Sequence, residues 1–73
     1  MVKKQITILL PAYNEEKSFP IIERCMNQVL NENPNYEWEF LFVNDGSTDN
    51  TLQQMIRFHK RDPHYNYIDL SHV

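Results

Sequence analysis

Residues 40–50 read Phe40-Leu41-Phe42-Val43-Asn44-Asp45-Gly46-Ser47-Thr48-Asp49-Asn50, and this stretch decides the fold. Four apolar residues in succession are typical of a strand that is buried on both faces, as in a parallel sheet. The run stops at Asp45, turns on the only glycine of the chain and continues in residues that favour helix starts. Ligands of open parallel sheets bind beyond the carboxyl ends of the strands. We therefore expect Asp45 to stand at a ligand-binding edge, beside a helix N-terminus that favours anions.

Length and composition fit one small globular domain. The chain has 73 residues, of which 41% are hydrophobic, and a net charge of −3. Its Lys and Arg residues are scattered without a basic stripe, which argues against a nucleic-acid partner. The single cysteine excludes an internal disulfide, and no apolar run approaches the ~20 residues that a membrane-spanning helix needs. These features predict a cytoplasmic chain without a membrane segment.

Hydrophobic periodicity predicts three strands that alternate with two helices. The expected elements are a strand over residues 6–10 that ends at Pro11, a helix from about Ser18 to residue 30, a strand from Tyr36 or Glu37 to Val43, a helix from Ser47–Asp49 to Arg61, and a strand over residues 66–70. In the second strand Trp38, Phe40 and Phe42 alternate and should pack on one face. The first helix should bury one broad apolar face, made of Ile21, Ile22, Cys25, Met26, Val29 and Leu30.

This order is that of an α/β protein built on a β-α-β-α-β unit with a parallel sheet. Right-handed crossovers should place both helices on one face of that sheet. The other face would then be uncovered, although parallel sheets are normally buried on both sides. We therefore expect residues 1–73 to be a partial, truncated domain.

The loops after the first two strands should meet at the same edge of the sheet. Residues 13–15 would then lie near residues 45–47, where a tyrosine ring can cover a flat base and a carboxylate can accept hydrogen bonds. An alternative interpretation is that Asn14, Asp45 and Ser47 only cap and turn the chain, as such residues commonly do.

Two segments together resemble a known family. Residues 8–16, Ile-Leu-Leu-Pro-Ala-Tyr-Asn-Glu-Glu, and residues 42–51, Phe-Val-Asn-Asp-Gly-Ser-Thr-Asp-Asn-Thr, are similar to the N-terminus of family-2 glycosyltransferases. Those enzymes are inverting, use nucleotide sugars and have the GT-A fold with its Rossmann-like nucleotide-binding half. Within the family the chain most resembles the polyprenyl- and dolichyl-phosphate sugar synthases.

The resemblance implies a nucleotide-binding role for five residues. Pro11, Ala12, Tyr13 and Glu15 would line the base and ribose, and Asp45 would contact the base. It also implies a donor linked to UDP or GDP. Asp49 would cap the second helix rather than touch ligand.

The chain also departs from the family pattern. The resemblance implies a divalent cation, Mg²⁺ or Mn²⁺, held in full-length relatives by an Asp-x-Asp motif that this sequence lacks. Asp45 alone is insufficient for a hard cation, so we expect no metal site here. In the synthases the segment after the third strand continues further, whereas here Leu70-Ser71 is followed by His72-Val73. The sequence is therefore expected to be a fragment that lacks the catalytic base.

We expect the nucleotide-sugar-binding portion of a transferase that passes a sugar to a lipid phosphate or saccharide, at the cytoplasmic face of a membrane in full-length relatives. The isolated chain should be inactive. The alternative is a non-catalytic piece whose uncovered sheet face docks on a C-terminal partner polypeptide.

Overall fold

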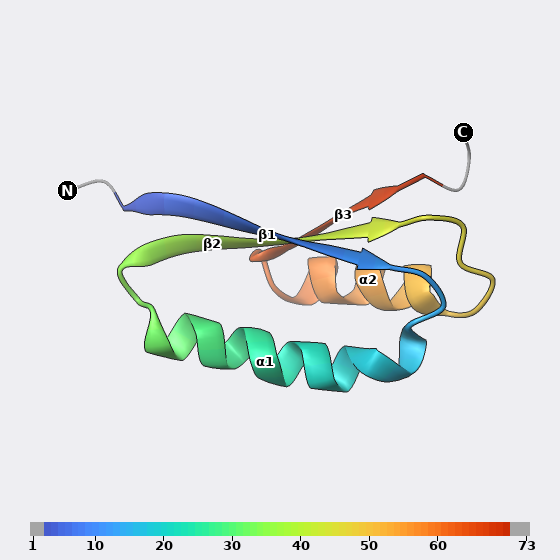
Figure 1. Cartoon of the computed structure of the whole chain (residues 1–73), viewed down its shortest axis with the longest axis horizontal. Coiled ribbons are helices and arrows are strands. Elements are labelled where there is room, and N and C mark those ends of the chain that lie inside the picture. Colours follow the sequence, from blue (N-terminus) through green and yellow to red (C-terminus); the bar gives the residue numbers. More distant parts are fainter. Residues whose placement is uncertain (1–2, 71–73) are drawn as a thin grey trace.

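The structure is a computed structural model and describes residues 3–70. Within this range three strands alternate with two α-helices, and a single 3-10 turn precedes the first helix (Figure 1). The elements are β1 (Lys4–Ala12), η1 (Glu16–Ser18), α1 (Phe19–Glu32), β2 (Tyr36–Asn44), α2 (Thr51–Arg61) and β3 (Tyr65–Asp69). The predicted β-α-β-α-β order is confirmed.

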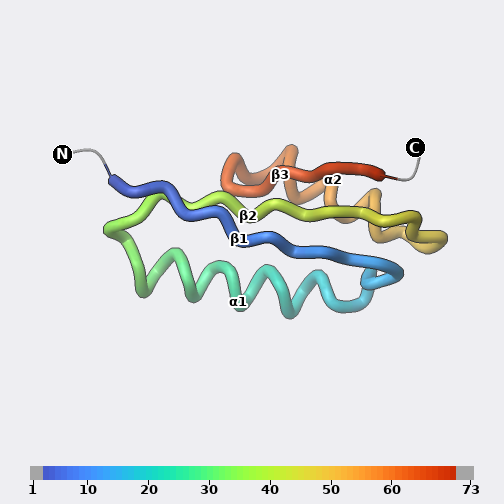
Figure 2. Tube along the Cα trace, turned by 45° about the horizontal axis from the view of Figure 1, so that its top comes forward, coloured from blue at the N-terminus to red at the C-terminus, as the bar shows by residue number. Residues whose placement is uncertain are grey.

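The strands form one parallel sheet in the order β1-β2-β3. Ala12 of β1 is in register with Asn44 of β2, and Asn44 is in register with Asp69 of β3. All three strands therefore end side by side. Their carboxyl ends form the edge of the sheet at which ligand binding was predicted from the sequence. Both helices lie on one face of the sheet (Figure 1), as right-handed crossovers require. Figure 2 shows α1 along the β1 side, whereas α2 packs against β2 and β3.

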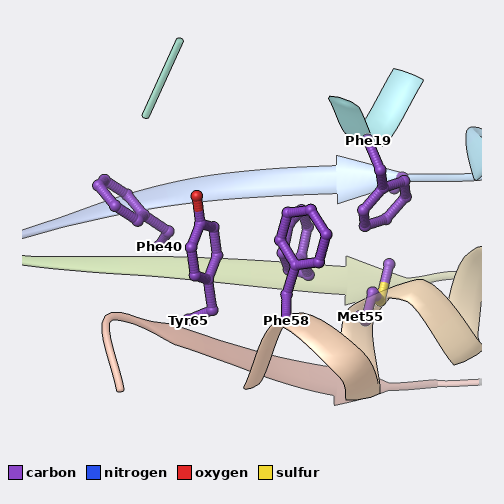
Figure 3. Close-up of a cluster of buried hydrophobic side chains, with 7 residues drawn as sticks. Phe19, Phe40, Met55, Phe58 and Tyr65 are labelled. Atoms are coloured by element: carbon purple, nitrogen blue, oxygen red, sulfur yellow. The ribbon is translucent and has the colours of Figure 1, made fainter. Parts of the chain in front are cut away.

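Aromatic side chains fill the core between the sheet and the helices (Figure 3). The ring of Phe42 lies 5.1 Å from that of Phe19 in α1 and 5.9 Å from that of Phe58 in α2. Tyr65 of β3 stacks on Phe42 from the third side, with 5.7 Å between ring centroids. Because Phe42 contacts both helices and a neighbouring strand, it is the centre of the packing.

The alternation predicted for β2 is confirmed. Phe40 and Phe42 are fully buried, and the Trp38 ring stacks on that of Phe40 at 6.4 Å. The Trp38 indole N–H donates to the carbonyl of Asn33 at 2.9 Å, so its polar group is satisfied. All three side chains thus face the helices.

The end of the first strand was predicted two residues too early. β1 continues through Pro11 to Ala12, and Pro11 is in register with Val43 of β2. Proline has no N–H to give to a ladder, but in the sheet formed by residues 3–70 β1 lies at the edge, where this loss is tolerated.

The prediction that Cys25 belongs to the core is wrong, because its side chain is exposed. α1 buries a narrower stripe than its sequence suggests. It contacts the core through Phe19, which the periodicity missed, and through Ile22, Met26, Val29 and Leu30, while Ile21 is exposed. A helix that covers one face of a three-stranded sheet has only that one surface to pack against among the described residues.

The second helix begins at Thr51, later than the expected start at Ser47–Asp49. Its N-cap residue, Asn50, forms no side-chain capping bond. Residues 47–49 instead interact with the loop after β1, as described below. Tertiary hydrogen bonds therefore decide where α2 starts.

The face of the sheet away from the helices is uncovered by residues 3–70, as predicted. Leu9 is 62% exposed there and Ile68 is 45% exposed. Glu39 links the three strands on this face, since its carboxylate accepts hydrogen bonds from Thr7 of β1 and Asn66 of β3.

Candidate functional site

The candidate site lies where β1 and β2 end side by side (Figure 1). Residues 13–15 follow β1 and residues 45–50 follow β2, and we name these segments the first loop and the second loop. Because Ala12 and Asn44 are paired in the sheet, the two loops leave from adjacent points on its edge. The predicted meeting of these loops is confirmed by the hydrogen bonds that join them.

Asn14 is the main link between the loops. Its carboxamide oxygen accepts hydrogen bonds from the backbone N–H groups of Thr48, at 2.8 Å, and Asp49, at 3.3 Å. Its own backbone N–H donates to the hydroxyl oxygen of Ser47 at 3.0 Å. Asn14 has a φ of 52°, in the left-handed region that Asn tolerates better than most residues. Backbone conformation and side chain therefore both serve the contact.

A second set of hydrogen bonds ties the chain after β1 to the start of α2. The backbone N–H of Glu15 donates to the Thr51 hydroxyl at 2.8 Å, and that of Glu16 donates to the Asp49 carboxylate at 3.4 Å. Asp49 also accepts from the backbone N–H and the hydroxyl of Thr51. The Thr51 side chain is completely buried, and its hydroxyl is satisfied as both donor and acceptor.

These contacts also affect the ionisation of Asp49. The hydrogen bond from the Thr51 hydroxyl is the largest influence and lowers the pKa of Asp49, burial opposes it, and the backbone N–H groups of Thr51 and Glu16 lower it further. The pKa of Asp49 therefore lies below the ordinary value of an aspartate. The interpretation of Asp49 as a capping rather than a ligand residue agrees with this, since its carboxylate bonds the first turn of α2.

The turn that carries Asp45 is held by Asn44. This residue is 1% exposed, its amide group donates to the Asp69 carboxylate at 3.0 Å, and its amide oxygen accepts from the backbone N–H of Ser47 at 3.2 Å. Gly46 has a φ of +84° with open space where a Cβ would stand, so its conformation rather than crowding requires glycine. Asn44 thus connects the end of β3 to the second loop.

The five residues predicted to bind nucleotide lie at or beside this edge, in different surroundings. Tyr13 is 58% exposed, and Asp45 is also exposed. Within residues 3–70 no hydrogen bond or ion pair engages either side chain. The Glu15 carboxylate accepts a hydrogen bond from the Ser18 hydroxyl at 3.0 Å. Pro11 is exposed on β1, whereas the Ala12 side chain belongs to the buried core.

Sequence reasoning missed the residues whose hydrogen bonds hold the two loops in place at this edge. Asn14 and Ser47 were expected to lie near each other, with turning or capping as the alternative, but the hydrogen bonds between the loops were not predicted, and no role was assigned to Thr51 or Asp69. Asn44 had a usable signal, because it continues the alternation of Phe40 and Phe42 toward the helices and so had to be buried. A polar residue at a core-facing position needs partners.

A cavity lies at the opposite end of the sheet, away from the two loops. It has a volume of about 510 Å³ and is lined by Trp38, Tyr36, Pro63 and His64 among others. The candidate site is instead an open surface. Among residues 3–70 no group of three or more His, Cys, Asp or Glu side chains is placed to hold a metal ion. No helix in that range is long and apolar enough to cross a membrane.

Comparison with known proteins identifies the family. The sequence profile of "Glycosyl transferase family 2" matches residues 7–72. The chain is 40% identical over 50 residues to CsbB of Bacillus subtilis, whose own description as a glycosyltransferase is provisional; the match covers 68% of this chain and 15% of CsbB.

Two further relatives act on lipid phosphates, by their names. A dolichyl-phosphate beta-glucosyltransferase of Trichomonas vaginalis is 36% identical over 61 residues, covering 78% of this chain and 18% of the relative. An undecaprenyl-phosphate 4-deoxy-4-formamido-L-arabinose transferase of Salmonella choleraesuis is 32% identical over 54 residues, covering 74% and 16%. The chain spans less than a fifth of the length of these relatives. Its small α/β unit agrees with the nucleotide-binding half of a GT-A domain, and the chain belongs to glycosyl transferase family 2.

Proposed function

We propose that this chain forms the base-and-ribose wall of a nucleotide-sugar site. The observation that carries the proposal is the joined pair of loops at the carboxyl edge of the sheet, which leaves Asp45 and Tyr13 exposed and unengaged within residues 3–70. Asp45 and Tyr13 differ in this from Asn14, Ser47 and Thr51, whose side chains at the same edge already have partners. Parallel sheets bind ligands at this edge, so Asp45 and Tyr13 are available to a ligand.

The chemistry of the available groups favours a base with an N–H on its edge. A carboxylate only accepts hydrogen bonds, so Asp45 suits the ring N–H of uracil or guanine. The corresponding ring nitrogen of cytosine is itself an acceptor and would face Asp45 unfavourably. Tyr13 offers a flat ring to cover the base, and Glu15 offers a carboxylate to a ribose hydroxyl. Pro11 completes the wall, and Ala12 contributes through its backbone because its side chain is in the core.

The complete protein is proposed to transfer a sugar from UDP or GDP to a lipid phosphate or saccharide, at the cytoplasmic face of a membrane. The acceptor oxygen forms a bond to the anomeric carbon while the bond to the diphosphate breaks, and the nucleoside diphosphate leaves. A divalent cation, Mg²⁺ or Mn²⁺, would neutralise charge on the leaving diphosphate if other parts of the complete protein held one. The acidic residues of 3–70 do not fit such an ion, because no three of them lie together.

Two expectations follow for the 73-residue chain alone. Mg²⁺ should change its nucleotide affinity little, because the wall contacts the nucleoside and not the diphosphate. Its transferase turnover should be negligible, and measurable transfer from a radiolabelled donor sugar would contradict this.

The binding proposal is tested by titrating UDP, GDP and CDP into the chain by calorimetry or NMR. UDP or GDP should bind more tightly than CDP. Asp45→Asn should weaken the preferred nucleotide roughly ten- to a hundredfold, since hydrogen bonds to charged groups contribute about 1.5–3 kcal/mol. Glu37→Gln is the matched control, because Glu37 is an exposed carboxylate at the other end of β2. Equal affinity of the wild type and Asp45→Asn would overturn the proposal.

A second candidate function is favoured by the uncovered face of the sheet. Leu9 and Ile68 are exposed there, and parallel sheets are normally covered on both faces. We propose that a C-terminal polypeptide with an apolar helix covers this face. Size-exclusion chromatography of the chain with and without such a polypeptide should show a one-to-one complex that Leu9→Lys abolishes. Absence of a complex, or one that Leu9→Lys leaves intact, would contradict it.

A further inference from the structure

We infer that Asn14 is the positioning residue of this site, holding the loops that carry Tyr13 and Asp45 in place before a nucleotide arrives. The inference rests on the proposed function. Asn14 directly follows Tyr13, and its hydrogen-bond partners Ser47 and Thr48 lie two and three residues beyond Asp45. Within residues 3–70, it makes the loop-to-loop contacts nearest in sequence to both ligand-facing side chains.

The geometry requires the side-chain oxygen of Asn14. That one atom accepts from two successive backbone N–H groups, of Thr48 and Asp49, and lies 3.4 Å from the Thr48 hydroxyl. An oxygen with two lone pairs can serve two such donors, whereas an alanine at this position would leave both without this acceptor. The contact spans 34 residues of sequence and joins the two loops close to Tyr13 and Asp45.

The backbone of Asn14 makes a separate contribution. Its φ of 52° turns its own N–H toward the Ser47 hydroxyl. Glycine adopts this conformation readily, while aspartate tolerates it much as asparagine does. Asn14→Gly therefore keeps the backbone and removes the oxygen, and Asn14→Asp keeps both. Comparing these two variants separates the contribution of the side-chain oxygen from that of the backbone conformation.

The other contacts between the segments lie further from the ligand-facing groups. Glu15 and Glu16 donate to Thr51 and Asp49, which anchor the chain after β1 to the start of α2. They should hold the base of the loops when Asn14 is changed. Asn14→Gly is consequently expected to loosen the tips of the loops without unfolding the domain.

Loose loops must be ordered by the ligand, and this cost lowers affinity. Uridine is the suitable probe because it carries no phosphate that Asn14→Asp would repel. The wild type, Asn14→Gly and Asn14→Asp are titrated with uridine and with UDP by NMR. Amide hydrogen exchange of Thr48 and Asp49 is measured in the same samples without ligand. Asn35→Gly, an exposed turn residue between α1 and β2, is the matched control.

Asn14→Gly should weaken uridine binding about tenfold and accelerate exchange at Thr48 and Asp49. Asn14→Asp should stay within about threefold of the wild type in both measurements, and Asn35→Gly should match the wild type. Unchanged affinity in Asn14→Gly, or an Asn14→Asp as weak as Asn14→Gly, would overturn the positioning role. If the wild type binds GDP alone, guanosine and GDP replace uridine and UDP as the probes. If it binds neither UDP nor GDP, the proposed function fails and the positioning role with it. The exchange data then still report whether Asn14 holds the loops.

Discussion

Phe42 and Val43 are neighbours on β2 but face opposite sides of the sheet and meet different surroundings. Phe42 is fully buried between two helices and a tyrosine ring, whereas Val43 is only half-buried on the uncovered face. Both faces carry apolar side chains, and the helices make one of them the core. The difference shows that the covered face holds the fold together. The site that we propose lies apart from that core, in the loops at the carboxyl edge of the sheet.

The largest effect should come from Phe42→Ala. Truncation of a buried phenylalanine costs about 3–5 kcal/mol, which is a large part of the stability of a domain this small. Urea unfolding followed by circular dichroism should show a mostly unfolded variant. Val43→Ala, on the other face, should cost about 1 kcal/mol. Similar losses for the two variants would remove the distinction between the faces.

The next effect concerns two amides that each donate to a carboxylate. Asn44 donates to Asp69 from a fully buried position, and Asn66 donates to Glu39 on the uncovered face. Asn44→Ala should lower the free energy of unfolding by about 1–3 kcal/mol, because its partly buried partners Asp69 and Ser47 lose their hydrogen bonds. Asn66→Ala should cost less than about 1 kcal/mol, since water can replace it. The comparison fails if Asn66→Ala is the more damaging change in thermal melts.

Tyr65→Phe should stabilise the covered face by about 1 kcal/mol. The Tyr65 hydroxyl is buried and has no hydrogen-bond partner among the described residues, and such an unsatisfied group is costly. Burial is the main cause that raises the pKa of Tyr65 to about 12. The folded state thus favours the neutral phenol. The stability that Tyr65 contributes through this raised pKa is complete below pH 10 and is lost as the pH rises from 10 toward 12.

The urea midpoint of the wild type should therefore fall between pH 9 and pH 11 more than that of Tyr65→Phe. Parallel pH profiles of the two proteins would show that Tyr65 does not titrate as its burial requires.

The smallest effect on stability should come from Leu9→Lys. Leu9 is 62% exposed on the uncovered face, and substitutions at such positions usually change stability by less than about 0.5 kcal/mol. Solubility should rise because an exposed apolar group becomes charged. A loss of stability comparable to that of Phe42→Ala would mean that Leu9 is covered in solution.

Much of this architecture can be predicted from the sequence because the relevant signals are local. The apolar run through Val43 indicates a buried parallel strand, and the spacing of strands and helices then brings the two loops to one edge. The alternation of Trp38, Phe40 and Phe42 identifies the covered face. These predictions need only periodicity and the handedness of crossovers.

The details that failed depend on contacts between distant segments. Local propensity favours a helix start at Ser47–Asp49, but Ser47 and Asp49 bond to the first loop and α2 begins at Thr51. Cys25 fits the helical period yet is exposed, because α1 meets a single surface. The role of Asn14 is invisible locally for the same reason, since its partners lie more than 30 residues away.

The claim that a nucleotide binds at the two joined loops is tested most directly by finding which residues' NMR signals shift when the nucleotide is added. The two ends of the sheet offer a clear choice, between the joined loops at the carboxyl edge and the 510 Å³ cavity at the other end. On titration with UDP, we predict shifts of the backbone amides of residues 13–16 and 45–49 and an unchanged Trp38 indole N–H. Shifts confined to Trp38 and His64 would place the ligand in the cavity and contradict the account.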